Sequence, residues 1–239
     1  TVESYGGDLV LEGPDIRIGD VRLLVNYNDG LSPWPQVSTE VRRFEDLREP
    51  ARFNPAVLDI SVAPVWPIGD DLRFTGNFHM EDRRYMANLE ASYQPETDQF
   101  KALIRVPPVK FEPGAVQPLD LSPLYGAFFE DAEGSFEING EITADNGEVA
   151  SDLTLFIFDL SGRNGDIRVD GLNGEITLSG LNPWTTLPQQ TLTAEHLDVG
   201  LPLTDLSLTM ALPGDDSLRI DFASAKLAGG RIVVDPSVL

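Results

Sequence analysis

Residues 161–239 read SGRNGDIRVDGLNGEITLSGLNPWTTLPQQTLTAEHLDVGLPLTDLSLTMALPGDDSLRIDFASAKLAGGRIVVDPSVL, and this stretch decides the fold class. Apolar residues occupy alternate positions in short runs, which is typical of strands with one apolar face. Between the runs lie Asn164-Gly165, Asn173-Gly174 and Pro213-Gly214-Asp215. Such residues accept the positive φ angles that tight turns need. The stretch therefore predicts a series of short antiparallel strands.

The same alternation continues through the earlier part of the chain, for example at Leu58–Val62 and Phe100–Val106. We expect Pro107-Pro108 to end the second of these strands, because proline has no N–H to donate to a ladder. Two segments favour helices: Ser122–Phe129, with a proline in its first turn, and Thr39–Leu47, which has apolar residues at helical spacing. About a dozen strands with one or two short helices predict an all-β chain.

Alternation assigns one set of apolar residues to the inward face of the strands. A β-sandwich, in which this face is a dry core, and a single long curved sheet both produce this pattern. Alternation alone favours the sandwich. The inward residues are Phe136, Ile138, Ile142, Ile167, Val169, Ile176, Leu178, Leu206, Leu208, Met210, Leu218, Ile220 and Phe222.

The composition excludes several function classes. The chain has 239 residues and a formal net charge of -22, which repels the phosphates of nucleic acids. It contains no cysteine, so disulfides, thiolate catalysis and cysteine-based zinc sites are excluded, and two histidines leave little room for a histidine metal site. No apolar run approaches the roughly 18 residues of a membrane span. We predict no cofactor and no bound metal.

Catalytic motifs are also absent from the sequence. His79 and His196 are each isolated, and a lone histidine in a strand is more often solvated or packed than catalytic. Asp145, Asn146 and Glu148 cluster oxygen ligands but lack the alternate-position spacing of a calcium loop, which favours a hairpin turn. We therefore predict that the chain is not an enzyme.

Short motifs in the C-terminal half resemble those of the YdbH-like family, also labelled a "dicarboxylate transport" domain, within the AsmA-like group. Each motif is short, but their order and spacing cover about half of the chain. The best match is Gly200–Asp205. The others are Leu119–Leu124, Glu133–Phe136, Val169–Ile176, Pro188–Leu192 and Leu227–Arg231.

The resemblance implies a long curved sheet forming an open trough with an apolar inner face. With this resemblance we favour the trough over the sandwich. It implies a periplasmic, non-enzymatic segment that carries phospholipid acyl chains between the two membranes of Gram-negative bacteria. Family members are longer and carry an N-terminal membrane anchor, so we expect an internal segment of a protein anchored in the inner membrane. Expected partners are neighbouring parts of the parent chain, or a partner strand at the open sheet edges, for which a small outer-membrane lipoprotein is a candidate.

Under this interpretation residues 1–118 form a β-rich segment of the same sheet, and residues 119–239 form the YdbH-like segment, with a short helix near 122–129. Two alternatives remain open. One is an extracellular β-sandwich that binds glycans through Trp34, Trp66 or Trp184, since exposed tryptophans stack on sugars. The other is a β-rich hydrolase with paired carboxylates, which needs a cleft that the sequence does not indicate.

Overall fold

The structure is a computed structural model, which describes residues 2–12, 15–26, 36–64, 72–80, 86–127, 129–146, 148–181, 183–214 and 217–238. Its seventeen strands belong to one antiparallel sheet, and within the described residues no pairing closes that sheet on itself. The prediction of an all-β, open antiparallel sheet with one or two short helices is confirmed. The β-sandwich alternative is wrong, because there is no second sheet among the described strands to pack on the first.

The chain divides into two compact units. Unit 1 comprises Thr1–Val106, Leu121–Leu124 and Glu141–Val149, and unit 2 comprises Pro107–Asp120, Tyr125–Gly140 and Ala150–Leu239. The sequence-based division between residues 118 and 119 stays a prediction.

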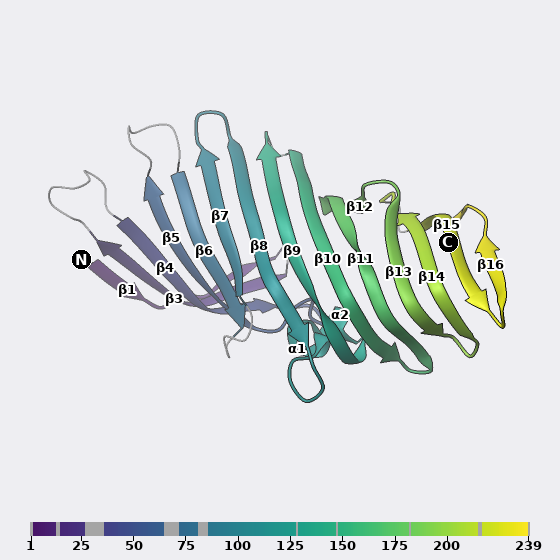
Figure 1. Cartoon of the computed structure of the whole chain (residues 1–239). Helices are drawn as coiled ribbons and strands as arrows, with labels where there is room; N and C mark the ends of the chain where they lie inside the picture. The colour runs from purple at the N-terminus through teal and green to yellow at the C-terminus, as the bar shows by residue number, and fades with distance from the viewer. Residues whose placement is uncertain are drawn as a thin grey trace. The chain divides into compact units, whose positions relative to one another are not determined.

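Unit 1 is a meander in which each long strand pairs with its neighbour in sequence (Figure 1). From β5 to β8 the registers contain no shift, so the alternation of faces carries from strand to strand without interruption. The strands are β1 (Val2–Tyr5), β2 (Leu9–Leu11), β3 (Ile16–Asn26), β4 (Gln36–Asp46), β5 (Ala56–Pro64), β6 (Leu72–Met80), β7 (Met86–Gln94) and β8 (Gln99–Phe111), the last of which ends in unit 2.

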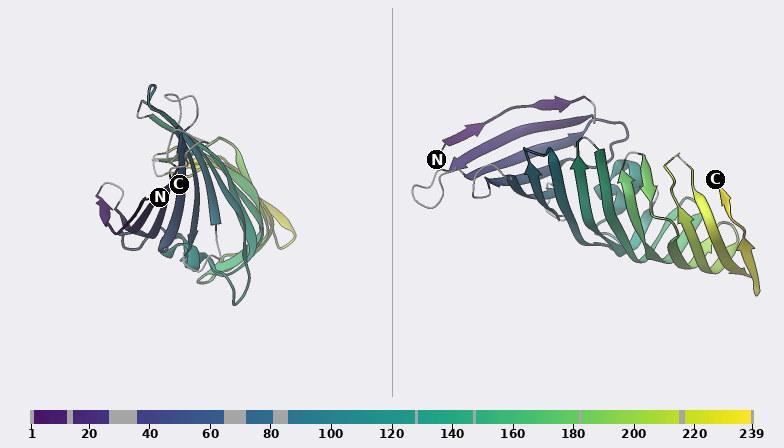
Figure 2. Two further views of the ribbon diagram at one scale, coloured as in Figure 1. Left: turned by 90° about the vertical axis from the view of Figure 1, so that its left-hand side faces the viewer. Right: turned by 90° about the horizontal axis from the view of Figure 1, so that it is seen from above.

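The first three strands of unit 2 are the longest of the described strands, with 15 to 17 residues, and they bend along their length in Figure 2. Bulges explain the bending: register shifts interrupt the pairs β10–β11 and β14–β15, and φ is positive at Asp159, Gly171 and Asp205. The strands are β9 (Glu130–Asp145), β10 (Glu148–Asn164), β11 (Ile167–Leu181), β12 (Trp184–Thr186), β13 (Gln190–Asp198), β14 (Pro202–Ala211), β15 (Arg219–Leu227), β16 (Gly230–Val234) and β17 (Ser237–Val238); the first residues of β10 and the last of β9 belong to unit 1.

Gly140 shows why glycine is required in the middle of β9. Its φ is +152°, and a Cβ atom there would lie 1.9 Å from the carbonyl oxygen of Asp152 and 2.8 Å from Cα of Leu153. The backbones of β9 and β10 therefore approach more closely here than any side chain allows.

The two helices among the described residues have four residues each, α1 (Pro118–Leu121) and α2 (Pro123–Gly126). The predicted helix over Ser122–Phe129 is therefore wrong in its bounds. Ser122 stands between α1 and α2 because the ring of Pro123 disfavours the helical conformation of the residue before it. At the start of α1 the carboxylate of Asp120 accepts a 2.9 Å hydrogen bond from the backbone N–H of Gln117.

Three further predictions are corrected. Thr39–Leu47 is not a helix, because residues 39–46 belong to β4. Pro107 and Pro108 do not end their strand: β8 continues to Phe111, and its pairs with β7 already end at Arg105, so the prolines interrupt no ladder on that side. Asn173-Gly174 is not a turn but lies inside β11.

Candidate functional site

Unit 1 has one apolar face, made of rungs that run across neighbouring strands. Directly opposed residues of an antiparallel pair point to the same side of the sheet, so the registers define the rungs. One rung crosses six strands as Val25, Val37, Val62, Phe74, Ala91 and Ala102, and the next is Leu23, Thr39, Ile60, Gly76, Leu89 and Ile104. We call this side, together with Val21, Val41, Leu58 and Phe78, the apolar face of unit 1.

The opposite side of the same strands is polar. Between the apolar rungs lies a rung of Arg22, Glu40, Asp59, Asn77, Asn88 and Arg105. Arg22 Nη2 pairs with the carboxylate of Glu3, and Arg22 Nη1 lies 3.8 Å from Glu40 Oε2. The sheet of unit 1 therefore presents one side that suits water and one that suits hydrocarbon.

A loop closes one end of this apolar face. Residues 47–55 connect β4 to β5 and fold back, so that the ring of Phe53 stacks on that of Phe44 with centroids 5.3 Å apart. Phe78, from the apolar face itself, meets both rings edge-on, with centroids 6.0 Å from Phe44 and 6.2 Å from Phe53. Beneath them Ala56 is fully buried.

An ion pair with a buried carboxylate holds this loop in place. The Asp46 side chain is 0% exposed, and its Oδ2 accepts hydrogen bonds from Nε and the backbone N–H of Arg52 at 2.7 and 2.6 Å. Hydrogen bonds from the Arg52 guanidinium, and from the backbone N–H groups of Arg52 and Arg48, lower the pKa of Asp46 from 3.8 to about 2. Burial opposes this shift, so the bonds outweigh the desolvation of the carboxylate.

Unit 2 has an apolar face built in the same way. One rung crosses β10, β11, β13, β14, β15 and β16 as Ile157, Gly174, Leu192, Leu208, Ala223 and Val234. Adjacent pairs on this side are Leu155 with Ile176, Leu153 with Leu178, and Ala194 with Leu206. The neighbouring rung on the other side is Asn173, Thr193, Ser207, Ser224 and Val233. We call the first side the apolar face of unit 2.

The structure brings together most of the residues expected to line a groove. Ile176, Leu178, Leu206, Leu208 and Met210 share the apolar face of unit 2, and Ile220 joins them opposite Met210. Phe136 and Ile138 lie two residues apart in β9 and therefore share a side, with the Phe136 ring 5.6 Å from the buried ring of Phe111. Leu218 precedes β15 and is half-buried.

Ile167 and Val169 lie beyond an irregularity in the strands of unit 2. Val169 opposes Leu197, which opposes Leu203, and Ile167 is two residues from Val169. Gly171 and Asp205, between these residues and the rung through Leu208, have a positive φ, and a register shift separates Thr204 from Ser207. The alternation of sides is therefore interrupted, and Ile167 and Val169 are not assigned to the apolar face of unit 2.

Phe222 and Ile142 are also not part of this group. Phe222 opposes Thr209, which places it on the other side of the sheet from Leu208 and Met210, and it is 38% exposed. A register shift between Thr209 and Met210 separates Phe222 from Ile220 in this way. Ile142 lies in the part of β9 that belongs to unit 1.

Sequence reasoning missed several residues of these faces. Leu153, Leu155 and Ile157 of β10 were not expected to line the groove, because the strand reads as an unbroken apolar run with no visible alternation. Its other side carries Phe156 and Phe158, whose rings stack with centroids 6.4 Å apart, and Phe158 is 44% exposed. Period-two alternation indicated the strands of unit 1 and their apolar side, but this part of the sequence contains no family motif that would have marked it as a site.

Neither apolar face is covered like the core of a sandwich. Among the described residues, seven of the thirteen buried apolar side chains are alanines, namely Ala56, Ala91, Ala102, Ala132, Ala194, Ala211 and Ala225. The large aliphatic side chains of the rungs, such as Ile60 and Leu208, are only half-buried. Among the residues that the structure describes, no second sheet packs on either face.

Of the histidines and tryptophans considered as alternative sites, those that the structure describes lie apart, on separate strands. His79 is buried on the polar side of unit 1, where its Nδ1 lies 2.9 Å from the carbonyl oxygen of Met80 and its Nε2 3.4 Å from Asp59 Oδ2. His196 is exposed in β13. Trp184 is half-exposed, and Trp34 and Trp66 lie outside the described residues. The residues described contain no cluster of three or more possible metal ligands.

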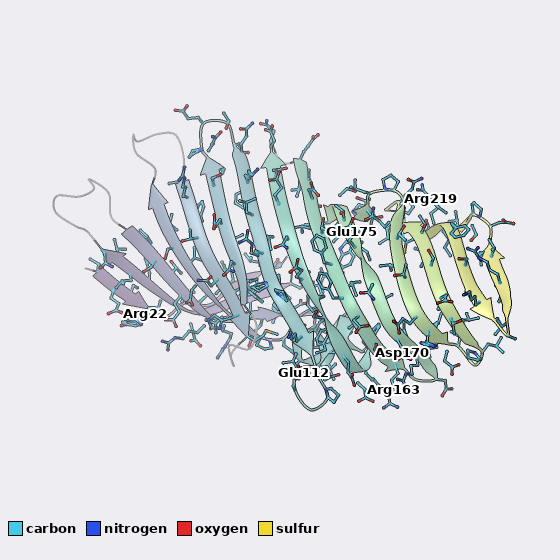
Figure 3. All side chains as sticks on the ribbon, in the orientation of Figure 1. Arg22, Glu112, Arg163, Asp170, Glu175 and Arg219 are labelled. Atoms are coloured by element: carbon cyan, nitrogen blue, oxygen red, sulfur yellow. The ribbon has the colours of Figure 1, made fainter. Side chains whose placement is uncertain are left out.

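A polar hollow in unit 2 is lined by Asp131, Glu133, Ser161, Arg163, Arg168 and Asp170, of which Arg163 and Asp170 are labelled in Figure 3. Each of its guanidinium groups is already paired: Arg163 Nε lies 2.8 Å from Asp131 Oδ2, and Arg168 Nε lies 2.9 Å from Asp170 Oδ1. The hollow therefore offers no uncompensated positive charge for an anion.

Comparison with protein families identifies these surfaces. The family model described as "YdbH-like: Intermembrane phospholipid transport protein YdbH" matches residues 34–239. The chain belongs to the YdbH-like family. The resemblance drawn from the C-terminal motifs is confirmed, and the match extends over most of unit 1 as well. The YdbH-like family is one of intermembrane phospholipid transport, which agrees with an open sheet that has apolar faces.

No curated protein and no solved structure matches this YdbH-like chain. Among the described residues, none of the helices has the length and apolar character needed to cross a bilayer.

Proposed function

We propose that this chain is a periplasmic segment of an intermembrane phospholipid-transport protein and carries acyl chains along its apolar faces. The observation that supports this most directly is the pair of apolar rungs, one of which crosses six strands of unit 1 and the other six strands of unit 2. A soluble protein rarely leaves so large an apolar surface without a ligand or a partner.

The chemistry of the rungs suits acyl chains. Burial of hydrocarbon gains about 0.8 kcal/mol per CH₂ group, so an aliphatic surface holds an acyl chain without any specific polar contact. The rungs repeat similar side chains from strand to strand, so no position traps a chain and a lipid can slide. A dicarboxylate, which the older family label suggests, would lose its hydration here without gaining hydrogen bonds.

The edges of the sheet support the proposed partners. Val2 and Tyr5 of β1 and Val233 of β16 are more than half exposed, and they lie on strands at the edges of their units. Exposed edge strands pair readily with further strands. We propose that they join neighbouring parts of a parent chain anchored in the inner membrane, or a partner strand such as that of a small outer-membrane lipoprotein.

Native mass spectrometry with lipid extraction tests the acyl-carrying role. The chain is purified from a Gram-negative host, and phospholipid is expected to co-purify at a reproducible ratio. The variant Ile60→Asp, which puts a charge on the apolar face of unit 1, should lower that ratio, because an unpaired carboxylate repels hydrocarbon.

Ser61→Asp is the matched control, since Ser61 is the next residue but lies on the polar side and is exposed. It should leave the lipid ratio unchanged. A lipid-free wild-type chain that remains folded and monodisperse would refute the proposed function.

A further inference from the structure

We infer that loop 47–55 acts as a plug that fixes the orientation of acyl chains on the apolar face of unit 1. The plug consists of Phe53 and Arg52 from the loop together with Phe44, Phe78 and Asp46. In this arrangement the methyl ends of the acyl chains contact the plug, and the phospholipid headgroups stay at the opposite ends of the strands. The inference rests on the proposed function.

The loop is longer and better held than a connection between neighbouring strands requires. Hairpin loops usually have two to five residues, whereas residues 47–55 make a longer connection between β4 and β5. Three hydrogen bonds at 2.6, 2.7 and 3.0 Å join Arg52 to the Asp46 carboxylate. Charge-assisted bonds of this kind, around a fully buried carboxylate, fix the loop in one position.

A second segment backs the loop. The backbone N–H of Asn54 donates a 3.0 Å hydrogen bond to the carbonyl oxygen of Leu121, and the backbone N–H of Leu124 donates a 2.9 Å bond to the carbonyl oxygen of Ala51. Both bonds are within unit 1. The loop is thus held from the sheet side by Asp46 and from the other side by residues 121–124.

The apolar face of unit 1 therefore has two unlike ends. At the plug, Ala56 is 0% exposed and Met80 is 7% exposed, so neither side chain is accessible to a ligand. Away from the plug, Leu23 is 37% exposed and the rung from Val25 to Phe74 is half-buried. The plug itself presents aromatic rings, while its one buried charge is already neutralised, so it suits a methyl group and offers nothing to a phosphate.

Photo-crosslinking with two phospholipid probes tests this orientation on the whole chain. One probe carries a diazirine at the methyl end of an acyl chain, and the other carries it next to the ester carbonyl. Each is supplied in phosphatidylglycerol vesicles, and adducts are located by peptide mass spectrometry. The methyl-end probe should label peptides that contain Phe53 and Phe78, and the carbonyl-end probe should label peptides that contain Val37 and Val62.

The variant Phe53→Ala should shift the methyl-end adducts onto Leu121 and Leu124, which lie behind the loop, whereas Leu47→Ala, an exposed change in the same loop, should leave them in place. The comparison of the two probes on the wild-type chain tests the orientation even when Phe53→Ala does not fold. Identical adduct patterns for the two probes, or methyl-end adducts at Val62, would overturn the plug and leave the acyl-carrying role standing. No adducts on unit 1 from either probe would instead remove the proposed function.

Discussion

The Asp46–Arg52 pair allows a quantitative prediction about the stability of unit 1. In Asp46→Asn the partly exposed Arg52 guanidinium loses its counter-charge, and the new amide turns a donor toward it. The pKa of Asp46 is lowered from 3.8 to about 2, and at 1.36 kcal/mol per pH unit this corresponds to about 2 kcal/mol of stabilisation at neutral pH. The opening free energy of β4 and β5 should fall by that amount.

Native-state hydrogen exchange measured by mass spectrometry reports this loss within unit 1. When the exchange rate is set by the opening equilibrium, a loss of about 2 kcal/mol in opening free energy raises that rate roughly 30-fold. The amides of peptides 36–46 and 56–64 should therefore exchange roughly 30-fold faster in Asp46→Asn than in the wild type. Asp15→Asn is the control, since Asp15 pairs with Arg48 at 3.3 Å but both side chains are about half exposed. Its effect should be about 2-fold or less, because exposed ion pairs contribute little.

The pH dependence gives a second criterion. A carboxylate whose pKa is lower in the folded state stabilises the protein above its unfolded pKa of 3.8, and the stabilisation disappears as the pH falls through the folded value of about 2. The difference between Asp46→Asn and the wild type, compared at the same pH, should therefore be constant above pH 5 and shrink between about pH 4 and pH 2. A difference no larger than that of the control, or one that persists unchanged at the lowest pH, would refute this account of the loop.

Two further predictions concern unit 2 and the backbone of β9. Leu208→Asp should leave the chain folded but reduce the phospholipid that co-purifies in native mass spectrometry. Thr209→Asp, on the other side of β14, should leave the amount of phospholipid unchanged. Unfolding of Leu208→Asp would mean that its side of the sheet is a closed core. Gly140→Ala should cost at least about 3 kcal/mol in urea unfolding, because its Cβ would overlap the backbone of β10. Gly200→Ala, at a positive φ with open space around it, should cost only about 1 kcal/mol, and equal losses in the two variants would contradict the close approach of the strands.

Period-two alternation predicted the strands and most residues of the apolar faces, because the pleat fixes which side chains share a side. The prediction failed where a bulge adds a residue to a strand and so changes which side the following residues face. Val41 and Phe44 lie three apart, which suggested a helix, but a register shift between them in the β4–β5 ladder puts both on the apolar face of unit 1. A bulge therefore imitates helical spacing, and the sequence contains no signal that separates the two.

The same limitation explains the misplacement of Phe222. In an unbroken strand it would share a side with Ile220, and only the shift between Thr209 and Met210 moves it to the polar side. The sequence also did not predict the plug. Asp46 and Arg52 are six residues apart in an acidic chain where many such pairs occur, and their burial depends on how loop 47–55 folds back over the strands.

The pairing of strands with their sequence neighbours, as from β3 to β8, has a consequence for how such a protein can evolve. Each added hairpin needs only the preceding strand as a template, and because opposed residues share a side, a duplicated hairpin in register continues both the hydrocarbon and the water-facing surface. Insertion of a single residue within a strand, in contrast, exchanges the two surfaces beyond that point, except where the extra residue forms a bulge as in β4. The distance that such a sheet spans can therefore grow or shrink in steps of two strands, as in solenoid repeats, without redesign of the lipid-contacting surface.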